Sequence, residues 1–232
     1  MSLPNIEILD TDGAIREAGE AVAGDTRSAF FRKAAVGGGA VLGSGAILGM
    51  LPTLAHAAPS PSQDIDILNY ALTLEYLEAA FYDGAVKSGN LEGDAKQFAQ
   101  LVLKHENIHV KALKATIKAL DGKAVKEPRF NFKGTNTNPA KFVATSLLLE
   151  NTGVHAYLGQ AARIQNPAIL KAAASILATE ARHAAAIAVV IGKSPFKDGA
   201  GTSITPDAAF DVPFSMKRVL KAVDKTNFIK GF

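Results

Sequence analysis

The sequence contains no cysteine, and this absence removes several classes of protein from consideration. Disulfide-stabilised folds are excluded, and so are zinc and iron sites held by thiolates. Aromatic residues make up only 7% of the chain, and runs of alternating Val, Ile and Thr are missing. Hydrophobic residues nevertheless reach 48%, with Ala and Leu prominent, which is enough for a substantial core. This balance favours an all-α domain.

A strong charge of one sign is also missing, because the chain carries a net charge of only +3. Its lysines are scattered along the expected helices, as on solvated faces, so we expect no nucleic-acid partner. Repeats with a fixed period of roughly 20–50 residues are absent as well, which excludes solenoid architectures. The 232 residues therefore suit one domain with appendages.

Residues 1–57 are expected to form an export signal. The uncharged apolar stretch 34–54 follows a short basic segment and ends at Ala55-His56-Ala57, a pattern typical of a signal peptide that is cleaved after its last alanine. Segment 26–33 resembles a twin-arginine signal, with Ser28 in place of the second arginine. The alternative is an uncleaved anchor, because about 20 apolar residues can span a bilayer. We therefore expect an exported, periplasmic or otherwise extracytoplasmic protein, which is associated with a membrane only if the leader is retained.

Four helices are expected within residues 60–192, because apolar residues recur there at helical spacing between capping sequences. The first begins at Ser60-Pro61-Ser62-Gln63 and ends by Gly84 to Gly89, and the second runs from near Gly93 to Asp121, before Gly122. The third begins at Asn138-Pro139 and ends near Arg163, and the fourth begins at Asn166-Pro167 and ends at Gly192. Gly153 and Gly159 lie inside the third helix, where close packing is expected to require them. Residues 193–232 form a Phe-containing tail that we expect to pack on the bundle.

The lengths of the connections predict the topology. The first and third connections are short, so each joins antiparallel helices. The second connection, residues 123–137, can reach about 50 Å at ~3.3 Å per residue. A helix of about 25 residues is only ~37 Å long. The second connection can therefore run the full length of the bundle and leave the second and third helices parallel.

One pattern of polar residues carries the functional prediction. A Glu-x-x-His step lies in the second helix and another in the fourth, and the first and third helices each carry a glutamate near the middle. Residues at mid-helix share one height in a bundle, and a histidine three residues after a glutamate stays on the same face. Four carboxylates and two imidazoles in this order are the ligand set of a dinuclear metal site in a four-helix bundle. The predicted ligands are Glu75, Glu106, His109, Glu150, Glu180 and His183.

Other polar residues near this pattern have alternative interpretations. Glu78 lies one turn after Glu75 and is either an alternative ligand or a partner of the ligands. Tyr82, on the same helix face, either donates a hydrogen bond to a ligand carboxylate or packs in the core. His105 and His155 point away from the ligand face, so we expect both to be structural.

These motifs resemble those of the ferritin-like superfamily. Leu68-Asn69-x-x-Leu72-x-x-Glu75, followed by Tyr82, resembles the first helix of bacterioferritins. Segments 68–82 and 150–162 resemble bacterial ferritin-like proteins related to plant desiccation-related proteins. The resemblance covers residues 63–192 and implies a ferritin-like four-helix bundle with one long crossover between helices two and three.

The resemblance also implies a role for each predicted ligand. The bridging carboxylates would be Glu106 and Glu180, the terminal carboxylates Glu75 and Glu150, and the imidazoles, one for each metal, His109 and His183. Carboxylate and imidazole ligands suit Fe or Mn, so the expected cofactors are two Fe ions, with Mn as the alternative. No haem is expected, because Met216 is the only methionine after the leader.

The expected function is that of an exported di-iron carboxylate protein that reacts with O₂ or peroxide. Such chemistry would be of the ferroxidase or peroxidase type, or of the Mn-catalase type if manganese is bound. The alternative is a non-catalytic stress or desiccation-related protein in which the metal is structural or absent. The sequence leaves open whether the protein is an enzyme, and a homo-oligomer is compatible with either function.

Overall fold

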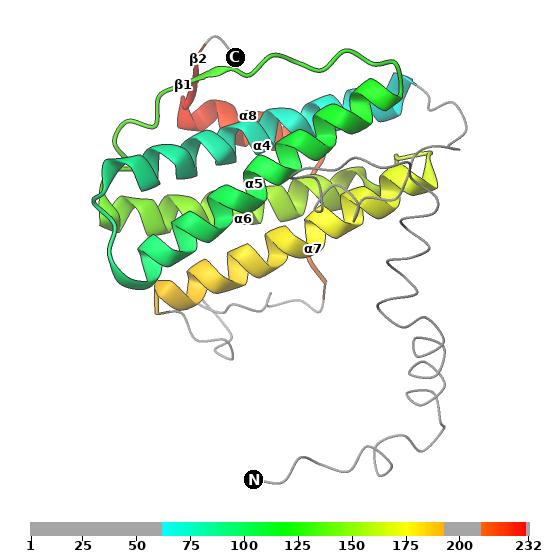
Figure 1. Ribbon diagram of the computed structural model, residues 1–232. Helices are drawn as coiled ribbons and strands as arrows, with labels where there is room; N and C mark the ends of the chain where they lie inside the picture. The colour runs from blue at the N-terminus through cyan, green and yellow to red at the C-terminus, as the bar shows by residue number, and fades with distance from the viewer. Residues whose placement is uncertain (1–61, 193–209, 231–232) are drawn as a thin grey trace, which may run out of the picture. The chain divides into compact units, whose positions relative to one another are not determined.

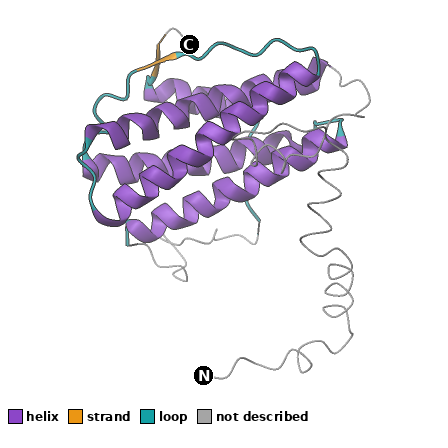
Figure 2. Cartoon of the chain, viewed as in Figure 1, coloured by secondary structure: helices purple, strands orange, loops and turns teal. Residues whose placement is uncertain are grey.

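A computed structural model describes residues 62–192 and 210–230 of the chain. The expected export signal, the first two residues of the first capping sequence and the tail segment 193–209 lie outside the described residues. Five helices and two short strands make up the described part, and the long helices form a bundle (Figures 1 and 2). The helices are α4 (Ser62–Ser88), α5 (Gly93–Ala119), α6 (Pro139–Ala161), α7 (Pro167–Val190) and α8 (Met216–Thr226).

The helix ends follow from capping residues that the sequence shows. The side chain of Asn138 accepts a hydrogen bond from the backbone N–H of Lys141 at the start of α6, and Asn166 caps α7 in the same way. A proline in the first turn follows each of these asparagines, where its missing N–H costs nothing. α5 ends two residues earlier than expected, at Ala119, and Asp121 then takes the left-handed conformation with φ 56°.

The connection between α5 and α6 is a long crossover. Figure 1 shows it, in green, running along the bundle from the end of α5 to the start of α6. α4 packs against α5 and α6 packs against α7, while α5 and α6 run in the same direction. The predicted all-α four-helix bundle with one long crossover between its second and third helices is therefore confirmed.

The C-terminal segment holds the crossover in place. Strand β1 (Arg129–Phe130) of the crossover pairs antiparallel with β2 (Ile229–Lys230). Beside this pair, the rings of Phe132 and Phe228 meet edge to face with centroids 5.4 Å apart. α8 lies against α6, so the described part of the tail packs on the bundle.

The core consists of two apolar clusters towards opposite ends of the bundle. One cluster includes the rings of Phe81, Phe98 and Phe142, and the other includes Leu72 and Ile117. Buried polar side chains from the middle of the helices lie between them. Within the described residues, α7 is the one helix that is long and apolar enough to cross a membrane, a test that the core helix of a folded bundle also passes.

Candidate metal centre

Each helix of the bundle places a predicted glutamate ligand in the polar layer at its middle. Glu75, Glu106, Glu150 and Glu180 are all completely buried. The structure brings the six predicted ligands together in two groups, within each of which the ligand atoms lie within 4.8 Å of one another. The first group is Glu75, Glu106, His109 and Glu180, and the second is Glu106, Glu150, Glu180 and His183. Glu106 and Glu180 therefore belong to both groups, and every other member belongs to one.

Both imidazoles face the carboxylates through Nδ1. His109 Nδ1 lies 3.1 Å from Glu75 Oε2 and 3.0 Å from Glu106 Oε2. His183 Nδ1 lies 3.1 Å from Glu150 Oε2 and 3.3 Å from Glu106 Oε1. Each histidine thus faces the glutamate on its neighbouring helix and also the shared glutamate Glu106.

The shared carboxylates carry oxygens without a hydrogen-bond partner among the described residues. These atoms are Glu106 Oε1 and both carboxylate oxygens of Glu180. His109 Nδ1 is 3.4 Å from Glu180 Oε1, which is an ion-pair distance without hydrogen-bond geometry. A buried carboxylate oxygen without a partner is costly, and a cation between the carboxylates would remove that cost. The residues present therefore fit a pair of metal ions.

Two tyrosines hold the other two carboxylates. Tyr82 donates a hydrogen bond to Glu150 Oε1, and Tyr157 donates one to Glu75 Oε1. The sequence left open whether Tyr82 donates a hydrogen bond to a ligand carboxylate or packs in the core, and in the structure it donates one to Glu150. Tyr157 was missed, although it follows Glu150 by seven residues, the same spacing that separates Glu75 from Tyr82.

The glycines inside α6 have more specific reasons than close packing of helices. A Cβ atom on Gly153 would lie 2.8 Å from Glu180 Oε2, so this glycine makes room for a shared carboxylate. A Cβ atom on Gly159 would lie 1.8 Å from the carbonyl oxygen of Phe214, so this glycine makes room for the tail. His155, on the same helix, also contacts the tail, since its Nδ1 is 2.7 Å from the carbonyl oxygen of Val212.

The carboxylates differ in how their surroundings affect ionisation. Burial raises the pKa of Glu106 and Glu180 well above the usual range, and the nearby carboxylates add to the effect. Burial also acts to raise the pKa of Glu75, but the charge of His109 and hydrogen bonds with His109, Glu106 and Tyr157 together lower that pKa overall. Burial opposes protonation of His109, whereas Glu75 favours it and raises the pKa of the imidazole. The metal-free site therefore holds protons that bound cations would displace.

Two further polar residues border the ligand groups. Glu78 is buried but belongs to neither group, and burial followed by the charges of nearby carboxylates raises its pKa well above the usual range. His105 was expected to be structural, but its Nδ1 lies 2.8 Å from Nε2 of His183. No spacing rule signals this contact, because His105 starts from a different face of α5 than the neighbouring Glu106.

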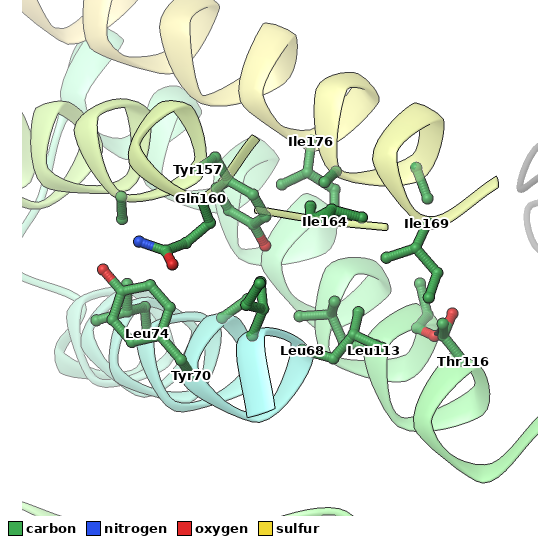
Figure 3. Close-up of a pocket in the computed structure, with 16 residues that line it drawn as sticks. Leu68, Tyr70, Leu74, Leu113, Thr116, Tyr157, Gln160, Ile164, Ile169 and Ile176 are labelled. Atoms are coloured by element: carbon green, nitrogen blue, oxygen red, sulfur yellow. Dashed lines mark hydrogen bonds between the residues drawn. The ribbon is translucent and has the colours of Figure 1, made fainter. Parts of the chain in front are cut away.

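A mostly apolar pocket adjoins the centre at Tyr157. Figure 3 shows its lining residues, which come from all four bundle helices and include Leu68, Ile169 and Ile176. The hydroxyl group of Tyr70 and the side-chain nitrogen of Gln160 lack hydrogen-bond partners in the described part of the chain. The pocket therefore offers a largely apolar space next to the phenol that holds Glu75.

The comparisons with known proteins agree with this geometry. A family model described as a ferritin-like domain matches residues 63–193, which is more than half of the chain. None of the curated proteins compared with the chain matches it. The matched segment contains all four bundle helices after the first residue of α4 and every member of both ligand groups. The chain belongs to the ferritin-like family, and its buried carboxylates and imidazoles form a site with the residues needed to bind metal ions.

Proposed function

We propose that this protein binds two iron ions, with manganese as the alternative metal, and reacts with O₂ or peroxide. The observation that carries the proposal is the sharing of Glu106 and Glu180 between two otherwise separate ligand groups. Each group offers three carboxylates and one imidazole, a mixed oxygen and nitrogen set that suits Fe or Mn. The four carboxylates also balance the positive charges of two divalent ions, which makes a buried pair of ions tolerable.

The protein side chains would prepare this site in three ways. Tyr82 and Tyr157 each occupy one oxygen of a terminal carboxylate, so the other oxygen stays directed towards an imidazole. Burial of all four carboxylates keeps bulk water away. The apolar pocket beside Tyr157 would give a small uncharged oxidant an apolar space next to the residue that holds Glu75. A bound iron pair would supply the electrons that reduce O₂ or peroxide.

Metal stoichiometry tests the proposal. The purified full chain is expected to contain two Fe or two Mn per molecule, and replacement of both Glu106 and Glu180 by alanine is expected to abolish binding. Replacement of the exposed residues Glu92 and Glu127 by alanine is the matched control, because it removes the same charge outside the site. A folded protein that takes up neither metal would contradict the proposal, whereas bound metal would justify assays of iron oxidation and peroxide consumption.

A non-catalytic function is the second candidate, in which the metal mainly stabilises the bundle. The unpartnered oxygens of Glu106 and Glu180 favour it too, because satisfying them stabilises the folded state whether or not any turnover occurs. A metal-dependent rise in melting temperature without consumption of O₂ or peroxide would support this stress or desiccation-related function.

Export remains part of the proposal and rests on the leader in residues 1–57. A cleaved leader predicts a mature N-terminus at Ala58 in the extracytoplasmic fraction. N-terminal sequencing of the protein from that fraction checks this, and an intact leader in the membrane fraction would point to the anchor instead.

A further inference from the structure

His105 reaches from α5 across to α7 and contacts a predicted metal ligand from outside both ligand groups. Its Nδ1 lies 2.8 Å from Nε2 of His183. The two rings are nearly parallel, at 15°, with centroids 5.1 Å apart. The opposite ring nitrogen of His183, Nδ1, faces Glu150 and Glu106. The imidazole of His183 is therefore held on one side by carboxylates and on the other by His105.

The second predicted imidazole ligand lacks such support. His109 Nδ1 faces Glu75 and Glu106 much as His183 Nδ1 faces its own carboxylates. Across residues 62–192 and 210–230, however, His109 Nε2 makes no hydrogen bond comparable to the one between His183 and His105. The two ligand groups, otherwise alike, thus differ in how their imidazoles are held.

We propose that His105 is a positioning residue that orients His183 and makes the metal position of Glu150 and His183 the tighter of the two. This inference rests on the proposed binding of two metal ions. An imidazole that gives the lone pair of Nδ1 to a metal carries its proton on Nε2, and that N–H needs an acceptor. His105 Nδ1 is the acceptor at hydrogen-bond distance. A partner of this kind fixes the ring and its tautomer, and its removal typically weakens metal binding by about 10–100-fold.

Two substitutions separate the hydrogen bond from the ring contact. In His105→Asn the acceptor Oδ1 is bonded to Cγ as Nδ1 is in histidine, but the ring is lost. In His105→Phe an aromatic ring is kept at this position and the acceptor is lost. His155→Phe is the matched control, because His155 contacts the tail and belongs to neither ligand group. His105→Leu replaces the Phe variant if the latter does not fold.

The experiment is a calorimetric titration of the metal-free full chain with Co²⁺, followed in parallel by its visible absorption. The wild-type protein is expected to bind two equivalents with unequal affinities. His105→Phe is expected to weaken one equivalent by about 10–100-fold and to leave the other unchanged. His105→Asn is expected to restore most of the lost affinity, and His155→Phe is expected to match the wild type.

The outcomes distinguish this inference from the proposed function. Wild-type protein that binds no metal would overturn both. Two equivalents in wild type with an unchanged titration in His105→Phe would overturn the positioning role alone. Equal losses in the Phe and Asn variants would also overturn it, because an acceptor at this position would then not restore metal binding.

Discussion

Tyr157 donates a hydrogen bond to Glu75, although the two residues lie 82 positions apart on different helices. Tyr82 donates a hydrogen bond to Glu150 in the reciprocal manner. Each tyrosine follows one of these glutamates by seven residues on its own helix and yet contacts the other glutamate. The α4–α5 and α6–α7 halves of the bundle therefore exchange hydrogen bonds across the centre, so each half fixes a predicted ligand of the other.

Removal of either phenolic hydroxyl is expected to weaken metal binding. Tyr82→Phe or Tyr157→Phe leaves one terminal carboxylate oxygen without its donor, so affinity is expected to fall by about 10-fold or more. The free energy of unfolding is expected to fall by about 1–3 kcal/mol, the cost of an unsatisfied buried group. Metal titration and urea unfolding measure the two effects. Tyr76→Phe is the control, since Tyr76 is buried in the same apolar cluster as Tyr157 but makes no hydrogen bond to a ligand carboxylate in the described part of the chain. Equal affinities in all three variants would contradict the assigned role.

The two glycines of α6 are expected to respond to alanine in opposite ways. In Gly153→Ala the new methyl group would meet the carboxylate of Glu180, the movable end of a side chain. We expect weaker metal binding with stability unchanged or raised, because alanine favours the helix by up to about 1 kcal/mol. In Gly159→Ala the methyl group would meet the backbone of Phe214, which has to move away with the tail. We expect lower stability there with metal stoichiometry preserved.

Metal analysis and thermal unfolding of both alanine variants check this pair. The two glycines share a helix and a substitution, so helix propensity changes equally in both and only the neighbouring atoms differ. Undiminished metal affinity in Gly153→Ala would show that the shared carboxylate is not what Gly153 accommodates. Loss of metal in Gly159→Ala would show that Gly159 does more than make room for the tail.

The sequence predicted the parts of the site that follow from periodicity. A glutamate near the middle of each helix and a histidine three residues after two of them are positions on a helix face, and helical geometry fixes them locally. Asn138 and Asn166 fixed the helix starts for the same local reason. The fold was predictable because one connection was long enough to cross the bundle and the others were not.

The missed features depend on how the helices pack. Which glutamate Tyr82 reaches is decided by the rotation of α4 against α6, and one helix alone does not show it. His105 starts about 100° away from Glu106 on the helix, yet its ring reaches His183 because α5 and α7 are neighbours. The contact between Gly159 and Phe214 joins the bundle to a tail that carries no helical pattern at that point.

The stability of the metal-free protein is expected to fall as the pH rises from about 5 to about 8. Burial raises the pKa of Glu106 and Glu180, so the folded state keeps protons that the unfolded chain releases near its ordinary pKa of 4.5. A state that holds more protons is destabilised relative to the other as pH rises. The raised pKa of His109 acts in the same direction above its ordinary value of 6.5. The pKa of Glu75 is lowered instead, so the stability that its carboxylate gives the folded protein is lost only as the pH falls below 4.5.

Urea unfolding of chelator-treated protein across this pH window measures the slope. Glu106→Gln is expected to flatten it, because a neutral amide replaces a group that titrates differently in the two states. Metal-loaded protein is expected to show the opposite trend, since metal binding displaces protons and strengthens as pH rises. Stability of the metal-free protein that increases between pH 5 and 8 would contradict the assignment of raised pKa values to the shared carboxylates.

Glu78 is a fifth buried carboxyl group, and it is either a metal ligand or a partner of the ligands. Substitution by glutamine separates these two interpretations. Burial, followed by the charges of Glu150 and Glu106, raises its pKa, so in the metal-free protein it is expected to be neutral. It belongs to neither ligand group. Glu78→Gln keeps the size and the neutral state, so two metal ions per chain and a near-native melting temperature are expected. Glu106→Gln, in contrast, alters a member of both groups and is expected to lose metal.

Metal stoichiometry of these two glutamine variants decides the role of Glu78. If Glu78→Gln held one metal ion instead of two, Glu78 would be a ligand and the two groups of four would be incomplete. If it held two ions but bound them more weakly, Glu78 would act on the ligands through its neighbours. We expect full stoichiometry, because each group already supplies three carboxylates and one imidazole within 4.8 Å without Glu78. A further carboxylate charge there would add repulsion between buried anions that two divalent cations already balance.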